Sequence, residues 1–341
     1  MNMSKASYRF STATVDYHFD ARFSDLKKIA EGRRMILVTD EHLYAAHPKL
    51  FRKQDVIVLK PGEEYKVQPT VDAIIEQMIR FEADRKTLLV GVGGGVVTDM
   101  TGYAASVYMR GIPFGFVPTS LLAMVDASIG GKNGIDVGPY KNMVGVIRQP
   151  QFLLYDYTLL KSLPDAEWSN GFAEIIKHAC IRDKAAFDLL EKEGVASFKR
   201  SRAKLAALVE RNAQLKSSVV VKDEFEQGDR KLLNFGHTLG HALETQYELS
   251  HGQAISIGMV HACRLSAQIE KFKDTDRVSS LLNAYGLPTE AKFKWSKVLG
   301  ILRMDKKRVN AGINYVLLKN IGKGVIKSLS LDELEERLTR P

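Results

Sequence analysis

Much of the reactive chemistry of this chain lies in one short run, Arg230-Lys-Leu-Leu-Asn-Phe-Gly-His237-Thr-Leu-Gly-His241. Residues i and i+4 of a helix share a face, so His237 and His241 can point into a single cavity. A third imidazole follows at His251, and a carboxylate, Glu174, lies upstream. Neutral imidazoles with one carboxylate form open catalytic zinc sites. The spacing therefore predicts a metal site. The alternative is a histidine pair that lies at the surface or is hydrogen-bonded within the core.

A glycine-rich segment, Gly91-Val-Gly-Gly-Gly-Val-Val-Thr-Asp99, follows a strand-like run and opens a helical one. Glycines let the backbone approach a pyrophosphate, and a helix N-terminus offers unpaired N–H groups. The segment departs from G-x-G-x-x-G because Val96 takes the place of the last glycine. It predicts a nucleotide site, and a tight strand–helix turn is the alternative.

Two further segments, Asp126-Ala-Ser-Ile-Gly-Gly-Lys132 and Tyr140-Lys141-Asn142, place two lysines and an asparagine in glycine-rich surroundings. Lysines supply positive charge and Asn supplies amide donors, so these segments predict an anion-binding surface. A solvated loop is the alternative. The apolar run Leu121-Leu-Ala-Met124 favours a segment held close to the core.

Strand-like and helical patterns alternate in the first half of the chain, and long helical patterns dominate the second. The sequence therefore predicts an α/β N-terminal Rossmann-like domain over residues 1–162 and an all-α C-terminal domain over 163–341. Expected strands are 34–39, 55–59 and 87–93; expected helices lie within 67–85, from about Val97, and over 184–192, 202–221 and 254–272.

Length and composition are those of a globular protein. At 341 residues the chain exceeds the ~250–300 at which one core stops growing, which favours two domains. No apolar run approaches the ~20 residues of a membrane span, and the N-terminus lacks a signal core, so a cytoplasmic location is expected. The net charge of +9 comes from dispersed residues, which favours a small anionic substrate over nucleic acid. Cys180 and Cys263 are expected to be buried free thiols.

Taken together, the motifs of this chain resemble the 3-dehydroquinate synthase family, in the sugar-phosphate cyclase superfamily. The likeness extends over nearly the whole chain, with motif order and spacing kept. Its motifs are Pro61-Gly-Glu-Glu-Tyr-Lys66, Gly93-Gly-Gly-Val-Val-Thr-Asp99-Met-Thr-Gly102, Tyr108-Met-Arg110-Gly111, Val117-Pro-Thr-Ser-Leu-Leu122, Asp126–Lys132, Lys141-Asn142, Ala173-Glu174-Ile-Ile-Lys177, Leu233–His241 and Asp305-Lys306-Lys307.

The resemblance implies a cytoplasmic homodimer that uses NAD and Zn²⁺, with Co²⁺ acceptable to the same ligands. It implies Glu174, His237 and His251 as metal ligands and turns His241 into a neighbouring substrate contact. For NAD it implies Asp40, Glu63, Lys66, Gly94, Gly95, Val96, Asp99, Thr119, Ser120 and Leu122, with Asp126, Lys132 and Lys141 also near the cofactor. For substrate it implies Asp126, Lys132, Lys141, Asn142, Lys177, Lys216, Arg230, Asn234, His241 and one of Lys306 and Lys307, with Arg110 reaching the partner's phosphate site.

The activity that the resemblance implies converts 3-deoxy-D-arabino-heptulosonate 7-phosphate into 3-dehydroquinate and phosphate, in the shikimate pathway to chorismate and the aromatic amino acids. The steps are transient oxidation by NAD, phosphate elimination, re-reduction and aldol closure. Arg230, Lys216 and Asn234 favour this carboxylated substrate over the glucose 6-phosphate of 2-deoxy-scyllo-inosose synthase or the sedoheptulose 7-phosphate of related cyclases. A glycerol-dehydrogenase-like metal-dependent oxidoreductase is the alternative from another class, and a non-catalytic binding module is disfavoured.

Three positions depart from the family pattern. Ser120 stands where a threonine is frequent, Gln253 replaces a glutamate beside His251, and His42 replaces an asparagine. None removes an implied ligand, but Gln253 removes a carboxylate that could have supported a metal-bound imidazole.

Overall fold

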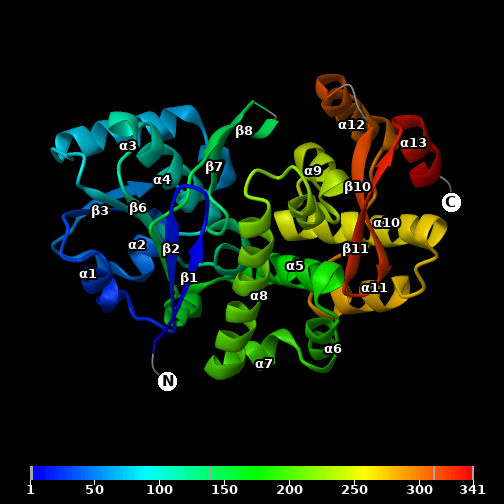
Figure 1. Cartoon of the computed structure of the whole chain (residues 1–341), viewed down its shortest axis with the longest axis horizontal. Coiled ribbons are helices and arrows are strands. Elements are labelled where there is room, and N and C mark those ends of the chain that lie inside the picture. The colour runs from blue at the N-terminus through cyan, green and yellow to red at the C-terminus, as the bar shows by residue number, and fades with distance from the viewer. Residues whose placement is uncertain (1–2, 139, 310–311, 340–341) are drawn as a thin grey trace. The chain divides into compact units, whose positions relative to one another are not determined.

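The computed structural model describes residues 3–138, 140–309 and 312–339, apart from the side chains of 304–309. The chain divides into two compact units (Figure 1). The first comprises Met1–Glu167 with Arg202–Phe225, and the second comprises Trp168–Ser201 with Glu226–Pro341. The segment 202–225 thus returns to the first unit after the second has begun. The expected division at 162/163 stays a prediction.

The first unit is built on a seven-stranded sheet of order β1-β2-β9-β6-β5-β3-β4. All neighbouring strands pair in parallel except β1, which is antiparallel to β2. The strands are β1 (Ser4–Arg9), β2 (Thr14–Phe19), β3 (Met35–Asp40), β4 (Asp55–Leu59), β5 (Leu88–Gly93), β6 (Phe114–Pro118) and β9 (Phe152–Leu154). The three strands expected from apolar runs lie within one residue of β3, β4 and β5, which confirms the α/β prediction.

Helices and short helical turns surround this sheet. They are η1 (Phe23–Asp25), α1 (Leu26–Ile29), α2 (Glu41–Ala46), η2 (Pro48–Phe51), η3 (Glu63–Tyr65), α3 (Gln68–Arg80), α4 (Gly95–Val107), η4 (Tyr108–Arg110), the π-turn η5 (Ala123–Ala127), η6 (Tyr157–Ser162) and α8 (Arg202–Lys222). A separate antiparallel hairpin is formed by β7 (Lys132–Val137) and β8 (Tyr140–Ile147).

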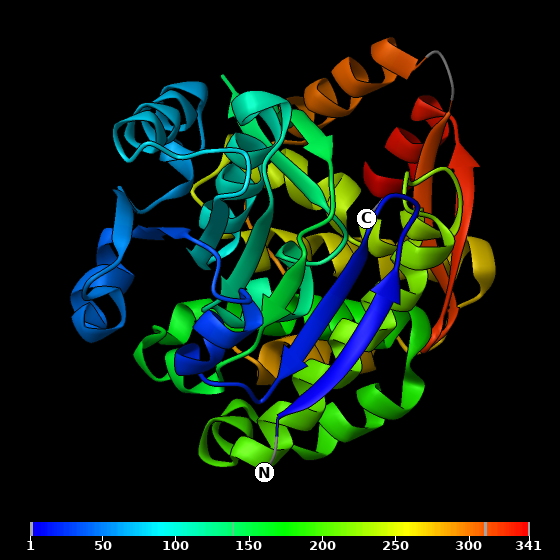
Figure 2. The same ribbon diagram turned by 60° about the vertical axis from the view of Figure 1, so that its left-hand side comes forward.

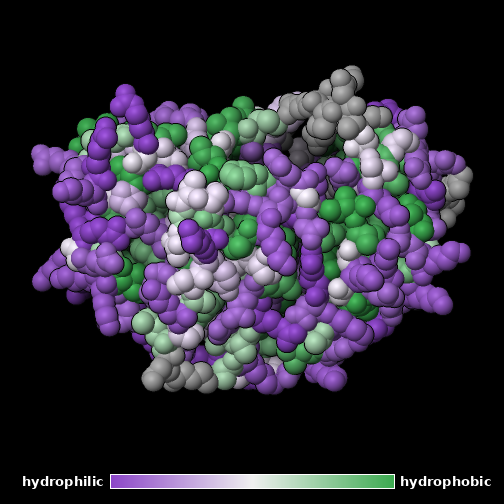
Figure 3. Space-filling model, viewed as in Figure 1, coloured by the Kyte–Doolittle hydropathy of each residue, from purple (hydrophilic) through white to green (hydrophobic). Residues whose placement is uncertain are grey.

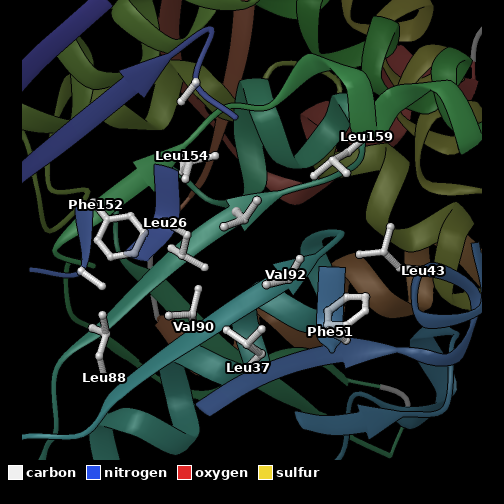
Figure 4. Packing of buried hydrophobic residues seen from close by; sticks show 13 residues of the cluster. Leu26, Leu37, Leu43, Phe51, Leu88, Val90, Val92, Phe152, Leu154 and Leu159 are labelled. Atoms are coloured by element: carbon white, nitrogen blue, oxygen red, sulfur yellow. The ribbon is translucent and has the colours of Figure 1, made fainter. Parts of the chain in front are cut away.

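The core of the first unit explains why its strands read as continuous apolar runs. Leu37, Val90 and Val92 from adjacent parallel strands are fully buried. They pack with Leu26 and Phe51 from the helical segments (Figure 4). Strands covered on both faces need apolar residues at successive positions rather than an alternating pattern. Complete burial of each such side chain contributes about 1.5–3 kcal/mol.

Helix α8 is fastened to the first unit along its length. At its first residue, the Arg202 guanidinium donates to Asp20 Oδ1 from Nε at 2.8 Å and from Nη2 at 2.5 Å. Further along, the Ser217 hydroxyl donates to the Tyr17 hydroxyl oxygen at 2.9 Å. These contacts explain why a helix so late in the sequence belongs to the N-terminal sheet.

The β7–β8 hairpin carries apolar side chains at the surface. Val137, Met143, Val144 and Ile147 are each more than a third exposed. Figure 3 shows hydrophobic surface where Figure 1 places this hairpin, among a largely hydrophilic face. Among the described residues, no helix is both long and apolar enough to cross a bilayer.

The second unit is mostly helical, as expected, with one addition. A hairpin of two antiparallel strands, β10 (Ile313–Asn320) and β11 (Lys323–Leu329), corrects the all-α prediction (Figure 2). Its turn uses Gly322 at φ +82°, which a glycine adopts without strain. The helical elements are α5 (Asp165–Arg182), α6 (Lys184–Lys192), α7 (Val195–Arg200), η7 (Asp229–Asn234), α9 (His237–Gln246), α10 (His251–Glu270), α11 (Thr275–Ala284), α12 (Trp295–Val309) and α13 (Leu331–Thr339).

Candidate functional site

Three helices of the second unit bring together one carboxylate and two imidazoles. Glu174 lies within α5, His237 is the first residue of α9, and His251 is the first residue of α10. One ligand atom from each lies within 4.8 Å of the others. The donor set and this spacing fit a divalent cation of the zinc type.

Close packing of α9 on α10 places the two histidines. A Cβ built at Gly258 of α10 would overlap the carbonyl oxygen of Gly236, and one at Gly240 would lie 2.7 Å from the Ile255 side chain. Gly236 itself adopts φ +80°, where a side chain would be strained. The glycines of the His-containing run therefore serve the approach of two helices.

The start of α10 is fixed on α5 by Asn170. Its Oδ1 accepts from the Ser250 hydroxyl at 2.7 Å and from the Gly252 N–H at 3.0 Å. Ser250 also forms a capping box with Gln253, which orders the first turn of α10. Because Asn170 lies one helical turn before Glu174, the same face of α5 holds both the carboxylate and the anchor of His251.

The two oxygens of Glu174 face different partners. Oε1 lies 3.5 Å from Nε2 of His237 and 3.2 Å from Nε2 of His251. Oε2 forms an ion pair with the buried Lys177 ammonium. The Nδ1–H of His237 can donate to the Phe235 carbonyl at 3.2 Å, which leaves Nε2 as the ligand atom.

The two imidazoles have opposite pKa shifts. Burial, reinforced by the positive charge of Lys177, holds the pKa of His237 well below its usual value, so this ring is neutral and ready to bind a cation. Burial also lowers the pKa of His251, but hydrogen bonding and charge from Glu174 and Glu244 outweigh it and raise the pKa to about 10. A cation at Nε2 would have to displace that proton.

His241 stands outside this three-donor group. Its ring centroid lies 5.0 Å from that of His237, and the side chain is exposed. Within the described part of the second unit, the possible ligands that come together are Glu174, His237 and His251, as the resemblance implies. The i,i+4 pair of His237 and His241, which spacing favoured, is not the group that forms. His251 lies on another helix, and only the tertiary fold brings it to His237.

The other expected substrate residues of the second unit lie on α5 and η7. Arg230 is 2% exposed, and Lys177 is 1% exposed. The Asn234 amide donates to Glu226 Oε1 at 2.6 Å. Lys306 and Lys307 fall outside the residues whose side chains are described.

In the first unit, the glycine-rich segment joins β5 to α4. Gly94 is the residue before the helix, and a Cβ at Gly93 would collide with Val97. Chain order reverses between β3 and β5, the switch point at which α/β sheets bind nucleotides. Asp40, at the end of β3, accepts the Leu43 N–H at 2.9 Å and so caps α2. Gly95 and Val96, also expected at the pyrophosphate, form the first turn of α4.

Five expected site residues converge through the buried Lys66. Its ammonium lies 2.7 Å from Asp99 Oδ2 and 3.8 Å from Glu63 Oε1, and donates to Asn142 Oδ1 at 2.7 Å. Lys141 lies 3.6 Å from the same Glu63 oxygen. Burial lowers the pKa of Lys66, but the surrounding carboxylates outweigh it and raise the pKa above its ordinary value. The structure thus joins η3, α4 and β8 through one cation.

The remaining expected residues divide into buried and exposed groups. Lys216 of α8 is paired with Asp126 Oδ1 at 2.7 Å and donates to its carbonyl oxygen at the same distance. Ser120 accepts the Ala123 N–H at 3.1 Å and so begins the π-turn η5. Thr119 is buried and Leu122 is half-buried, whereas Lys132 and Arg110 are exposed.

Two polar residues beside the three-donor group were not anticipated. Asn170 anchors α10, and Glu244 lies 3.6 Å from His251 Nδ1. Glu244 does have a local signal, because it lies seven residues after His237 and so falls on the same face of α9. Asn170 has a comparable one at four residues before Glu174.

Two adjacent family models match the chain. A model described as the 3-dehydroquinate synthase N-terminal domain matches residues 56–170, and one described as the C-terminal domain matches residues 171–308. This chain belongs to the 3-dehydroquinate synthase family. It is therefore an enzyme of the sugar-phosphate cyclase type, and the likeness read from its motifs is confirmed at that level.

Solved structures agree with this assignment. The 2-epi-5-epi-valiolone synthase of Streptomyces hygroscopicus subsp. jinggangensis, with NAD⁺ and Zn²⁺ bound, is 26% identical, with 98% of this chain and 97% of that chain covered and a TM-score of 0.87. A 2-deoxy-scyllo-inosose synthase complexed with carbaglucose-6-phosphate, NAD⁺ and Co²⁺ shares the fold at 24% identity, 98% and 99% coverage and a TM-score of 0.86. A glycerol dehydrogenase from Schizosaccharomyces pombe shares the fold less closely, at 15% identity, 99% and 91% coverage and a TM-score of 0.65.

Proposed function

We propose that this enzyme is a 3-dehydroquinate synthase, which converts 3-deoxy-D-arabino-heptulosonate 7-phosphate into 3-dehydroquinate and phosphate. The observation that carries the choice among cyclases is the buried Arg230, seven residues before the candidate ligand His237. A guanidinium stays charged at every accessible pH, and its planar fork matches a carboxylate. The heptulosonate has a carboxylate, whereas glucose 6-phosphate and sedoheptulose 7-phosphate do not.

Glu174, His237 and His251 would hold the divalent cation, Zn²⁺ or Co²⁺. When bound, such a cation polarises hydroxyl and carbonyl oxygens of the substrate. The neighbouring Lys177 forms an ion pair with Glu174, and its charge favours the neutral form of His237. That form is the one which leaves an imidazole lone pair for ligation.

NAD would bind at the end of β5. The first N–H groups of a helix have no acceptor within it, so the start of α4 suits a pyrophosphate, and Gly94 is the residue just before that start. Lys66 holds Asp99 and Asn142 in one cluster, so residues expected to contact NAD and substrate would be ordered together. The related valiolone synthase was solved with NAD⁺ and Zn²⁺ bound, which supports both cofactors here.

The enzyme would act as a homodimer, with Arg110 reaching the partner's site. Arg110 is exposed and has φ +65°, in a turn where Met109 is also left-handed. Light scattering of the purified chain checks the dimer, and a monomer at working concentration contradicts it. A two-domain division near 162/163, a cytoplasmic location and a place in the shikimate pathway remain parts of this proposal.

Phosphate release tests the substrate. The enzyme with NAD⁺ and Zn²⁺ is given the heptulosonate phosphate, glucose 6-phosphate or sedoheptulose 7-phosphate in separate reactions. We expect release from the heptulosonate alone, without steady-state growth of NADH, and loss of release after chelation with recovery on adding Zn²⁺. Release from a substrate without a carboxylate would assign a sister cyclase instead. Net NADH production would assign an oxidoreductase.

Arg230→Lys is the sharper variant, because it keeps the charge but loses the planar fork. We expect phosphate release from the heptulosonate to fall about 10²-fold, from loss of roughly 2–3 kcal/mol of charged hydrogen bonding. Lys231→Met, on the neighbouring half-buried residue, is the matched control and should stay near wild type. Wild-type activity in Arg230→Lys would remove the argument for the carboxylate.

A further inference from the structure

The candidate ligand His251 has a carboxylate on each side of its ring. Nε2 faces Glu174 Oε1 at 3.2 Å, and Nδ1 faces Glu244 Oε2 at 3.6 Å. The Glu244 side chain is 9% exposed, so little water competes for this contact. The separation is an ion-pair distance, slightly longer than a direct hydrogen bond. A small rotation of either side chain would close it.

Helix α9 supplies both a candidate ligand and this second carboxylate. His237 and Glu244 lie seven residues apart, or two turns, on one face of α9. The close approach of Gly236 to Gly258 sets that face against α10, which begins at His251. The position of Glu244 beside His251 is therefore fixed by the same packing that assembles the donor group.

Gln253, two residues after His251, is a polar side chain near it in the sequence that could orient the imidazole, but it already has another partner. Gln253 Oε1 accepts the Ser250 N–H at 3.0 Å as part of the capping box. This contact orders the start of α10. A carboxylate for His251 therefore comes from the neighbouring helix.

We propose that Glu244 is a positioning residue for the metal centre, acting through His251. Glu244 would accept a hydrogen bond from the Nδ1–H of His251. This bond would fix the tautomer in which Nε2 carries no proton and would make Nε2 a stronger metal ligand. The inference rests on the proposed metal site. In the other candidate histidine, His237, Nδ1 faces a neutral acceptor instead, the Phe235 carbonyl oxygen at 3.2 Å. The two candidate imidazole ligands would thus be oriented by acceptors of different charge.

Metal affinity gives a readout separate from turnover. Outer carboxylates of this kind change metal affinity by about 10–100-fold. Co²⁺ is titrated into metal-free wild type, Glu244→Gln and Glu244→Asp at one pH, with visible absorbance as the signal. We expect the Kd for Co²⁺ to rise about 10–100-fold in Glu244→Gln and to recover in part in Glu244→Asp. Glu248→Gln, on an exposed glutamate nearby, should keep the wild-type Kd.

Proton exchange in the Co²⁺-loaded protein tests the orienting contact itself. Wild type should show two shifted, exchangeable ring N–H resonances, from His237 and His251. In Glu244→Gln the His251 signal should broaden by faster exchange, while the His237 signal, held by a backbone carbonyl, should remain. This wild-type signature is readable even if a variant folds poorly.

The outcomes separate the two ideas. If wild type binds neither Co²⁺ nor Zn²⁺, the proposed metal site is wrong and the role of Glu244 is lost with it. If wild type binds Co²⁺ and Glu244→Gln binds it equally well, with both ring signals unchanged, the metal site stands and the inference about Glu244 is overturned.

Discussion

Two buried charge clusters, one in each unit, have opposite composition. In the first unit, one ammonium, Lys66, is surrounded by Asp99, Glu63 and the Asn142 amide oxygen. In the second, one carboxylate, Glu174, is surrounded by an ammonium and two imidazoles. In the first cluster the ammonium is already engaged by three acceptors, so we expect it mainly to order the residues around it. The second gathers lone pairs that a cation can use, so it is the better candidate for chemistry.

The largest expected effect comes from the centre of the second cluster. Glu174→Gln keeps the shape but replaces an anionic donor by an amide. We expect bound metal to be lost and phosphate release to fall by at least about 10³-fold. Metal content of the purified protein and single-turnover release measure the two effects, with Glu248→Gln as the control. Wild-type metal content in Glu174→Gln would break the contrast between the clusters.

Helix packing beneath the second cluster gives the next largest effect. Gly258→Ala improves helix propensity, but its methyl group would overlap the Gly236 carbonyl oxygen. We expect a net loss of about 3 kcal/mol in the free energy of unfolding. Both tryptophans, Trp168 and Trp295, belong to this unit, so their fluorescence in urea measures its unfolding.

Gly300→Ala is the matched control for that substitution. Gly300 also lies in a helix, and a Cβ there meets no atom within 4 Å. It should stabilise the protein by up to about 1 kcal/mol. Equal effects of the two substitutions would show that the close approach of α9 and α10 does not constrain the cluster.

Substitution in the first cluster should lower the free energy of unfolding. Lys66→Met leaves Asp99 without its nearest cation, and we expect a loss of about 2–3 kcal/mol. Hydrogen exchange over β5 and α4 measures this loss locally. Lys184→Met removes an exposed i,i+4 pair with Asp188 and should change the free energy of unfolding far less, because water screens this pair. If the two variants lose equal stability, the Lys66 cluster does not hold the first unit together.

The smallest effect concerns His261, a half-buried histidine of α10. Burial, then the charge of Arg264, lowers the pKa of His261 to about 4. Its ring lies 5.4 Å from that of Trp295, centroid to centroid. A lowered folded-state pKa means that stability is intact above about pH 6.5 and falls as pH drops toward 4.

His261→Phe should remove that part of the pH dependence. The difference in free energy of unfolding between wild type and His261→Phe should change by up to about 2 kcal/mol between pH 7 and pH 4. Tryptophan fluorescence again provides the measurement. A constant difference over this range would show that the ring is solvated.

Local patterns predicted the elements better than the site. The apolar runs of β3, β4 and β5 and the helix over 184–192 were readable because burial on both faces, or helical period, repeats within a few residues. The β10–β11 hairpin was missed, although the buried run from Tyr315 to Leu318 and the glycine at 322 were its signals. The long helices around it dominated the pattern.

Helical spacing alone pointed to one of the three candidate metal ligands. The local rule found His237 but paired it with His241, because neighbours on a helix are visible in the sequence. His251 comes to His237 only through the packing of α9 on α10. Glu174 comes to His251 because Asn170, also on α5, contacts the start of α10. The likeness of the motifs to a family supplied what spacing could not. The contact of Glu244 with His251 could be recognised only from the fold, because it joins two helices.

The return of α8 to the first unit has a practical consequence for dissecting the protein. A polypeptide that stops near residue 162 would lack the partners of Asp20, Tyr17 and Asp126, which Arg202, Ser217 and Lys216 provide. It would therefore lose the cations that pair with Asp20 and Asp126. To express the first unit alone, residues 202–225 would have to be joined to the N-terminal segment, because the unit is made of two separate stretches of the chain.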